Sequence, residues 1–345
     1  MVPVGIIGDG YTAADLLRIL GNHEHVRAVK IFSTENIGKD ITEVYPSLER
    51  LASLTCERTD LEALKRECQA VFLALPHGLS VPYVKELTEA GVRCIDLGAD
   101  FRLKDALVYE KYYELAHEAP EMLETAVYGL PELYRSQVAG AQVVANPGCF
   151  PTGAILALVP LLKAGLIETT GIVIDSKSGV SGAGRGLRLT SHFCEVNEGV
   201  HPYGVGTHRH APEIAQELGA AAGGPVQITF IPHLIPMSRG ILTTAYARLI
   251  PGVGAAEVSQ AFEDLYAGEF FIRLLPAGVY PHTRWVYGSN FVDIGTFVDE
   301  EQGRVIVMSA LDNLTKGASG QAVQNLNIMF GWEETEALRM GPVFP

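Results

Sequence analysis

The sequence predicts an α/β protein with a doubly wound parallel sheet of Rossmann type, followed by an α+β part with a mostly antiparallel sheet. Two observations predict the first sheet: a glycine-rich turn follows the first apolar run, and further apolar runs alternate with amphipathic stretches up to residue 145. The second sheet is predicted by a change in the sequence pattern. After residue 171, long apolar runs typical of strands follow one another.

Composition and charge narrow the class of protein. The formal net charge of −14 argues against nucleic acid or an anionic membrane as the main partner. The N-terminus enters an apolar run without a basic residue, so we expect no signal peptide, and no apolar run is long enough to cross a membrane. Five scattered cysteines without a Cys-x-x-Cys pair fit a reducing cytoplasm and argue against disulfides or a zinc cage.

The first element is a strand over residues 2–7, and the turn after it leads into a helical stretch. Gly8, Gly10 and Ala13 satisfy the G-x-G-x-x-G/A pattern of dinucleotide-binding folds. Gly8 permits a tight turn, and Gly10 lets backbone N–H groups approach a pyrophosphate at the helix N-terminus, beside Tyr11 and Thr12. A turn that serves only helix packing would fit the same pattern.

The second strand, residues 26–32, ends in Ser33 and Thr34. NAD-binding folds usually place an acidic residue here for the ribose hydroxyls. Hydroxyl groups at this place would tolerate a 2′-phosphate, so we expect NADP, although Glu35 stands nearby.

Three more strands are expected at residues 70–75, 93–97 and 142–145, and ligands bind beyond the C-terminal ends of such strands. The first of these ends carries Pro76 and Gly78 as candidate cofactor contacts, with His77 read as a turn residue. The second of these ends carries Arg102. Two interpretations of this residue stay open: it binds an anionic substrate, or it forms a salt bridge with Asp100 or Asp105.

The third strand runs into a turn that contains Cys149. Pro147 and Gly148 force the turn, and Pro151 suits the first turn of an apolar helix expected over residues 153–163. The dipole and N–H groups at a helix N-terminus stabilise a thiolate, which makes Cys149 a candidate nucleophile. A buried structural cysteine would fit the same turn.

The second part opens with a strand over residues 171–175 and a glycine- and serine-rich loop over 177–186. Ser178, Gly179 and Arg185 in this loop offer hydroxyl, N–H and guanidinium groups to a phosphate or carboxylate, although a flexible surface loop is the alternative. Its other expected strands are residues 226–231, 240–249, 291–297 and 304–310. The exposed face of their sheet is a plausible dimer surface.

A pair of histidines lies between two of these strands. In an extended segment His208 and His210 would point to one face, before Pro212 and Glu213 start a helix. No comparable spacing supplies further metal ligands, so we expect no metal and read at least one histidine as an acid–base group. The end of the chain predicts a helix over residues 312–326 that packs back on the first domain.

These motifs resemble, over essentially the whole chain, the N-acetyl-gamma-glutamyl-phosphate reductases of arginine biosynthesis, relatives of aspartate-semialdehyde dehydrogenase. The resemblance rests on Asn146-Pro-Gly-Cys-Phe-Pro-Thr152, Ser178-Gly-Val-Ser-Gly-Ala-Gly-Arg185, His208-Arg-His-Ala-Pro-Glu-Ile214, Pro232-His-Leu-Ile-Pro-Met-Ser-Arg-Gly-Ile241 and the helix over 312–325. The cysteine turn differs from the Asn-Cys-Ser/Thr context of the aspartate-semialdehyde branch.

The resemblance implies an NADPH-dependent reduction of an acyl phosphate to a semialdehyde, through a thioester on Cys149 and with His208 as acid–base residue. It implies an NADP-binding domain of residues 1–148 completed by 313–345, a catalytic and dimerisation domain of residues 149–312, and a homodimer or homotetramer. The implied substrate-binding residues are Arg102, Ser178, Gly179, Arg185, Tyr203, His210 and Glu213. The implied cofactor-binding residues are Gly8, Gly10, Tyr11, Thr12, Ala13, Ser33, Pro76, Gly78, Ser181, Gly182 and Asn313.

The glycine loop departs from that family's usual Gly-x-x-Gly-Tyr-x-Gly-x-Glu-Leu. It is one residue shorter, has Ala13 for the last glycine, and places the Asp9 carboxylate beside the expected pyrophosphate, where repulsion weakens binding unless the carboxylate points away. Two alternatives stay open: a reductase of an aminoadipyl phosphate in lysine synthesis, since one methylene is worth only about 1–3 kcal/mol in a pocket, and a non-catalytic nucleotide sensor.

Overall fold

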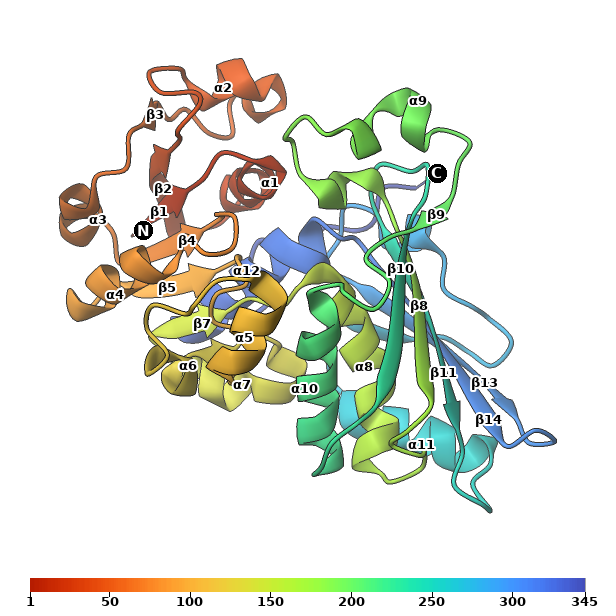
Figure 1. Cartoon of the computed structure of the whole chain (residues 1–345). Helices are drawn as coiled ribbons and strands as arrows, with labels where there is room; N and C mark the ends of the chain where they lie inside the picture. Colours follow the sequence, from red (N-terminus) through yellow and green to blue (C-terminus); the bar gives the residue numbers. More distant parts are fainter. Residues whose placement is uncertain (345) are drawn as a thin grey trace. The chain divides into compact units, whose positions relative to one another are not determined.

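The computed structural model describes residues 1–344 and divides into two compact units (Figure 1). The first unit holds Met1–Gly148 and Ala318–Met340, and the second holds Cys149–Gly317 together with residues 341–344. The return of the chain to the first unit therefore begins at Ala318, later than the expected residue 313.

The first unit is built on a seven-stranded parallel sheet in the order β3-β2-β1-β4-β5-β7-β6. Its strands are β1 (Val2–Ile7), β2 (Val26–Phe32), β3 (Cys56–Glu57), β4 (Ala70–Leu73), β5 (Arg93–Asp96), β6 (Val127–Tyr128) and β7 (Val143–Ala145). The chain leaves β1 toward β2 on one side and later returns to β4 on the other. The end of β1 is thus the switch point at which such sheets bind ligands. The predicted parallel sheet is confirmed.

Eight helices surround this sheet in the part of the chain that the structure describes. They are α1 (Tyr11–Leu20), α2 (Ile41–Val44), α3 (Leu61–Glu67), α4 (Val81–Glu89), α5 (Ala106–Tyr113), α6 (Met122–Thr125), α7 (Pro131–Ala139) and α12 (Gly320–Met329). Every residue of α12 is buried, and this helix packs against α1 and α7. The sequence predicted a helix near the end of the chain that packs back on the first domain, and α12 packs there.

The second unit contains a mixed sheet in the order β12-β13-β14-β11-β8-β10-β9, in which four of the six neighbouring pairs are antiparallel. The strands are β8 (Ile172–Ser178), β9 (His201–Pro202), β10 (Ile228–Leu234), β11 (Ile241–Arg248), β12 (Ile272–Leu274), β13 (Val292–Asp299) and β14 (Arg304–Leu311). Three long helices, α8 (Cys149–Lys163), α10 (His210–Ala222) and α11 (Ala255–Tyr266), lie along one face (Figure 1). The short helix α9 (Phe193–Val196) belongs to the segment before β9.

Helix α8 forms the centre of the second unit's core and is buried from Phe150 to Leu162. Pro160 stands inside it and has no N–H to donate to the carbonyl of Leu156. The hydroxyl of Tyr266 on α11 donates to that carbonyl instead, at 2.6 Å. The helix therefore continues through the proline without leaving a buried acceptor unsatisfied.

The C-terminal helix begins later than the sequence predicted. After β14 the buried carboxylate of Asp312 accepts hydrogen bonds from the backbone N–H groups of Leu314, Thr315 and Gly288, at 2.9, 3.2 and 2.7 Å. These bonds hold a turn, and a wide π-type turn over Thr315–Ser319 precedes α12. The expected helix start at residue 312 was wrong, because an aspartate that binds the following N–H groups favours a cap over a helix interior.

Candidate functional site

Cys149 is the first residue of α8, so the helix begins earlier than the predicted residue 153. Pro151 allows this start, because the N–H groups of the first helical turn have no partner within the helix. The cysteine is partly buried, whereas Cys56, Cys68 and Cys94 are buried and Cys194 is exposed. Its position at the positive end of a fifteen-residue helix favours the thiolate form.

The backbone of Gly317 packs closely against this cysteine. A Cβ atom on residue 317 would lie 2.8 Å from the Cβ of Cys149 and 3.2 Å from its Cα. Only glycine permits that approach. The backbone of the segment after β14 therefore packs directly against the backbone of Cys149 and helps to fix its position.

An aromatic cluster follows Cys149 along the chain. The Phe150 ring meets the rings of His208, His210 and Phe230 at centroid distances of 5.7, 5.8 and 5.5 Å. Tyr203 contacts the His208 ring at 5.4 Å. Both predicted histidines are thus brought to the N-terminus of the helix that carries Cys149, by contacts within one unit.

The geometry of the histidine pair differs from the prediction. The segment is not extended: α10 begins at His210, and its N-cap residue Arg209 already has right-handed helical angles. The two rings still lie 4.9 Å apart, and the His208 Nδ1 atom accepts a hydrogen bond from the His210 backbone N–H at 3.1 Å. The early start follows from this bond, which satisfies one of the N–H groups that a helix start leaves unpaired.

This hydrogen bond fixes the tautomer of His208. Because Nδ1 accepts, the proton of the neutral ring lies on Nε2, which can donate to a substrate oxygen. Burial, and then the positive charge of Arg209, lower the pKa of His208 to about 4. The ring is therefore neutral at physiological pH and acts there as a hydrogen-bond donor.

The pKa of Tyr203 is raised well above its ordinary value, first by burial and then by the negative charge of Cys149. Its backbone N–H donates to the Pro232 carbonyl at 3.0 Å, which anchors it beside β10. Tyr203 therefore remains a protonated phenol, suited to donate a hydrogen bond near the nucleophile. On α10, the Glu213 side chain is buried, with an exposed fraction of 1%.

The glycine- and serine-rich loop begins later than expected, since β8 extends to Ser178. The Ser178 hydroxyl is buried and donates to the Gly179 carbonyl at 3.1 Å, so in this arrangement its proton is used within the loop. Gly179 lies against the segment after β10: a Cβ atom there would come within 2.8 Å of the Ser238 carbonyl oxygen. Arg185 follows on the exposed part of the loop.

Asn313 joins this loop to the start of β11. Its amide Nδ2 donates to the Ser181 hydroxyl at 2.9 Å, and its Oδ1 accepts from the Gly240 backbone N–H at 2.7 Å. The predicted cofactor residues Ser181, Gly182 and Asn313 thus lie together, since a Cβ atom on Gly182 would be 3.7 Å from the Asn313 amide nitrogen.

In the first unit, the glycine loop fits a dinucleotide. Gly8 has a φ of +113°, and a Cβ atom there would lie 2.3 Å from the Ala74 carbonyl oxygen. Gly10 is the N-cap of α1, where no side chain caps the helix and a Cβ atom would meet nothing within 4 Å. Ala13 is fully buried in the helix packing. No side chain therefore caps the first N–H groups of α1, and these are the groups that bind a pyrophosphate in dinucleotide-binding folds.

Asp9 does not point at this helix start. Its Oδ2 atom accepts hydrogen bonds from the Ser33 hydroxyl at 2.7 Å and the Asn36 amide at 2.6 Å, just beyond the end of β2. The Tyr45 hydroxyl donates to the Asp9 carbonyl at 2.9 Å. The sequence motif alone gave no sign of this side-chain network, because its members are spread over residues 9–45.

The loops after β4 and β5 are organised by two buried aspartates. Asp100 accepts hydrogen bonds from the backbone N–H groups of Gly78 and Ser80, at 2.6 and 2.9 Å. The Ser80 hydroxyl donates to Asp96 at 2.7 Å, and burial followed by the charge of Asp100 raises the pKa of Asp96. Pro76 is exposed, and the His77 ring packs on Tyr113 at 5.4 Å.

Arg102 is also buried, with an exposed fraction of 7%. Its guanidinium donates to the carbonyl oxygens of Asn146 and Leu97, at 2.8 and 3.0 Å. Asp105 caps α5 by accepting from the Leu107 N–H, so the two candidate partners Asp100 and Asp105 both have other donors. Arg102 therefore ties the end of β5 to the cysteine turn.

Among the described residues there is no group of three or more His, Cys, Asp or Glu placed to hold a metal ion. Within the same range, no helix is long and apolar enough to cross a membrane.

Comparison with known proteins follows this division of the chain. A family model described as "Semialdehyde dehydrogenase, NAD binding domain" matches residues 3–141, and one described as "Semialdehyde dehydrogenase, dimerisation domain" matches residues 149–313. The N-acetyl-gamma-glutamyl-phosphate reductase of Moorella thermoacetica is 52% identical over 346 residues, covering 100% of both chains. That of Pelotomaculum thermopropionicum is 53% identical over 345 residues, covering 100% of this chain and 99% of its own.

Solved structures show the same fold at low identity. Aspartate semialdehyde dehydrogenase II of Vibrio cholerae, complexed with ASA, has a TM-score of 0.73 at 17% identity and covers 96% of this chain and 98% of its own. Aspartate semialdehyde dehydrogenase of Candida albicans, with NADP, has a TM-score of 0.73 at 16% identity and covers 96% and 99%. Both similarities support the predicted fold class.

Proposed function

The chain belongs to the N-acetyl-gamma-glutamyl-phosphate reductases, and from this premise we propose that it reduces N-acetyl-gamma-glutamyl phosphate to N-acetylglutamate 5-semialdehyde with release of phosphate, in arginine biosynthesis. One observation carries the proposal: Cys149 opens a long helix, and two histidines and a tyrosine gather at the same helix end. That arrangement suits acyl transfer through a thiol.

In the first step the Cys149 sulfur attacks the acyl carbon of the substrate. A carbon–sulfur bond forms, the bond from carbon to the phosphate oxygen breaks, and phosphate leaves with the electron pair. The thioester that results is a better hydride acceptor than a carboxylate, so one difficult reduction becomes two easier steps. The N-terminus of α8 lowers the free energy of the attacking thiolate.

His208 acts in this mechanism through its Nε2–H group. The donor stabilises the negative charge that develops on the carbonyl oxygen during attack and again during reduction. When the hemithioacetal collapses, the carbon–sulfur bond breaks, the aldehyde leaves and the thiolate is restored. Positioned donors and acid–base groups are typically worth about 10²–10⁴ in rate. The protonated phenol of Tyr203 is a second donor beside the nucleophile.

The remaining predicted residues bind the substrate in our proposal. Arg185 holds the phosphate, whereas His210 and Glu213 orient the acetylamino acid part. The backbone N–H groups of Gly179 and Ser181 already donate to the carbonyl oxygens of Gly240 and Ser238, at 2.9 and 3.1 Å. Arg102 remains a candidate for the substrate carboxylate, in addition to its bonds to two carbonyl groups.

A nicotinamide dinucleotide held by Gly8, Gly10, Tyr11, Thr12 and Ala13 would supply the hydride when bound. The open N-terminus of α1 and the turned-away Asp9 carboxylate fit its pyrophosphate. Ser181, Gly182 and Asn313 are proposed to hold its nicotinamide end. The choice between NADPH and NADH depends on the side chains at the end of β2. There the Ser33 hydroxyl already donates its hydrogen bond to the Asp9 carboxylate.

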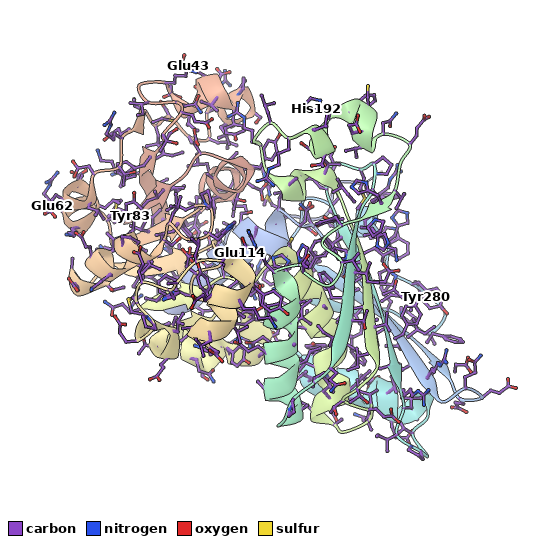
Figure 2. The ribbon with its side chains drawn as sticks, in the orientation of Figure 1. Glu43, Glu62, Tyr83, Glu114, His192 and Tyr280 are labelled. Carbon is purple, nitrogen blue, oxygen red and sulfur yellow. The ribbon has the colours of Figure 1, made fainter. Side chains whose placement is uncertain are left out.

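We also propose that the chain forms a homodimer or homotetramer in the cytoplasm. In the part of the second unit that the structure describes, the three long helices lie along one face of the sheet, and on the other face Tyr246 and Phe297 are 40% and 45% exposed. Tyr280, which is 44% exposed, also lies on the surface of this unit (Figure 2). Light scattering should give two or four chain masses for the wild type and a smaller mass for Tyr246→Arg.

The function is tested by the reverse reaction. Wild-type protein receives N-acetylglutamate semialdehyde, phosphate and an oxidised nicotinamide cofactor, with NAD⁺ and NADP⁺ in parallel, and absorbance at the reduced cofactor's band is followed. Cys149→Ala should lose the phosphate-dependent signal. The matched control Cys194→Ala removes an exposed cysteine and should keep it.

If only the one-carbon-longer aldehyde gave activity, the substrate of the forward reaction would be an aminoadipyl phosphate. Equal rates in wild type and Cys149→Ala would exclude the thioester mechanism. If neither aldehyde gave a change in absorbance although the cofactor still bound, the proposed reaction would be contradicted.

A further inference from the structure

We infer that Asp9 reads the 2′ position of the adenosine ribose and makes this chain prefer NADH to NADPH. The inference rests on the proposed function, because it takes the glycine loop as the seat of the cofactor. It departs from the sequence-based expectation of NADP, which depended on the hydroxyl groups after β2 and on the resemblance to the reductase family.

The location of the carboxylate is the first argument. In dinucleotide-binding folds an acidic side chain at the end of the second strand accepts a hydrogen bond from the ribose 2′-OH. Ser33 occupies that place, immediately after β2. The Asp9 Oδ2 atom lies 2.7 Å from the Ser33 hydroxyl oxygen. The Asp9 carboxylate from the glycine loop therefore lies beside Ser33, at the place where other dinucleotide-binding folds have an acidic residue.

The hydrogen bonds of Ser33 are the second argument. Its hydroxyl has one proton, which is donated to Asp9, and its oxygen accepts the backbone N–H groups of Glu35 and Asn36 at 3.1 and 2.9 Å. To donate to a 2′-phosphate, Ser33 would have to release Asp9. The serine that the sequence offered as a phosphate ligand instead orients a carboxylate.

The free side of that carboxylate is the third argument. Among the described residues, both side-chain hydrogen bonds to Asp9 reach Oδ2, from Ser33 and Asn36. Oδ1 therefore retains its capacity to accept from a ribose hydroxyl, as NADH offers. A 2′-phosphate would bring two negative groups together, and like charges placed against each other oppose binding strongly.

One cation stands at the edge of this cluster. The Lys39 ammonium donates to the Asn36 Oδ1 atom at 3.3 Å, and its side chain is exposed. An exposed ammonium group is well screened by solvent, so its attraction for a phosphate is weak. The Asp9 carboxylate, which is partly buried, sets the sign of the local field.

The test measures binding rather than turnover. Dissociation constants for NADH and NADPH are determined by calorimetry or by nucleotide fluorescence on the full chain. Wild type should bind NADH more tightly by about 10- to 100-fold, the range for a hydrogen bond to a charged group. Asp9→Asn keeps an oxygen that can accept from Ser33 and Asn36, and should reduce that ratio by about tenfold or more.

Two control variants remove the same charge elsewhere. Glu35→Gln tests the other carboxylate near the end of β2, and Glu62→Gln tests the general field from α3, where Glu62 is 78% exposed (Figure 2). Both should leave the ratio of the two dissociation constants unchanged. Melting temperatures of all variants report whether each one is folded.

The outcomes separate this inference from the proposed function. Tighter binding of NADPH by wild type, or an unchanged ratio in Asp9→Asn, overturns the role of Asp9 while leaving a cofactor-dependent reductase in place. A shift in Glu35→Gln alone assigns the discrimination to Glu35 and also overturns it. Failure of both nucleotides to bind folded protein contradicts the proposed function itself.

Discussion

The neutral state of His208 can be tested by changing the pH. Burial and the adjacent Arg209 charge lower the pKa of His208 to about 4, whereas an unfolded histidine titrates near 6.5. Protonation of the folded ring would also break the hydrogen bond that Nδ1 accepts from the His210 N–H at 3.1 Å. The folded state therefore resists protonation through the whole interval between those two values.

The sign and size of the effect on stability follow from this shift. Between pH 6.5 and about 4 the unfolded chain binds a proton on His208 that the folded chain does not. Stability from this group is therefore complete above pH 6.5 and is lost as the pH falls toward 4. The shift corresponds to at most about 3 kcal/mol, at 1.36 kcal/mol for each pKa unit.

Two measurements check this prediction. The C2–H resonance of His208, assigned by its absence in His208→Asn, should not titrate between pH 5 and 8. Guanidinium unfolding of wild type and His208→Asn should then differ in stability at pH 7 by more than at pH 4.5. Of the two tryptophans only Trp285 lies in the second unit, so a Trp332→Phe background isolates its fluorescence signal. A resonance that titrates near pH 6.5, or a difference that does not change with pH, would refute the neutral donor.

Three further variants test other parts of the structure. Tyr266→Phe should lower the free energy of unfolding in guanidinium by about 1–3 kcal/mol, since it leaves the Leu156 carbonyl unsatisfied. In a background with Pro160→Ala, which restores an N–H donor for that carbonyl, the same change should cost much less. Gly10→Ser should cap α1 without lowering the melting temperature, yet weaken cofactor binding in a titration by occupying the N–H groups that face the pyrophosphate. Arg102→Lys should lower the melting temperature, at a cost of about 1–3 kcal/mol, because an ammonium group cannot reproduce both guanidinium bonds to the two strand-end carbonyls; an unchanged melting temperature would contradict the structural role.

The sequence predicted the fold well where the pattern is local. The run over Val2–Ile7 and the glycines after it identified the parallel sheet, and the apolar strands of the second unit were placed to within a few residues. Strands of two residues, such as Cys56–Glu57 and His201–Pro202, escaped prediction because they are too short to show alternation. They form only through the neighbouring strands with which they pair.

Prediction of the site was limited by side-chain contacts that cross long stretches of sequence. The cysteine turn and the histidine pair could be recognised, because each is a short motif. The tautomer of His208 could not, since it depends on where α10 begins, and that start was expected later. The helix start at Cys149 was also earlier than expected, which strengthens the argument for a thiolate because the sulfur lies at the helix end itself.

The Asp9 carboxylate shows how one contact changes the meaning of a motif. Read along the sequence, it stands beside a pyrophosphate and should weaken cofactor binding. Hydrogen bonds from Ser33 and Asn36 turn it toward the end of β2, so that the charge no longer opposes the pyrophosphate but lies where a ribose is recognised. The same bonds consume the serine proton that a 2′-phosphate would need. A shortened glycine loop and an absent acid after β2, which look like two independent departures, are therefore one compensated change.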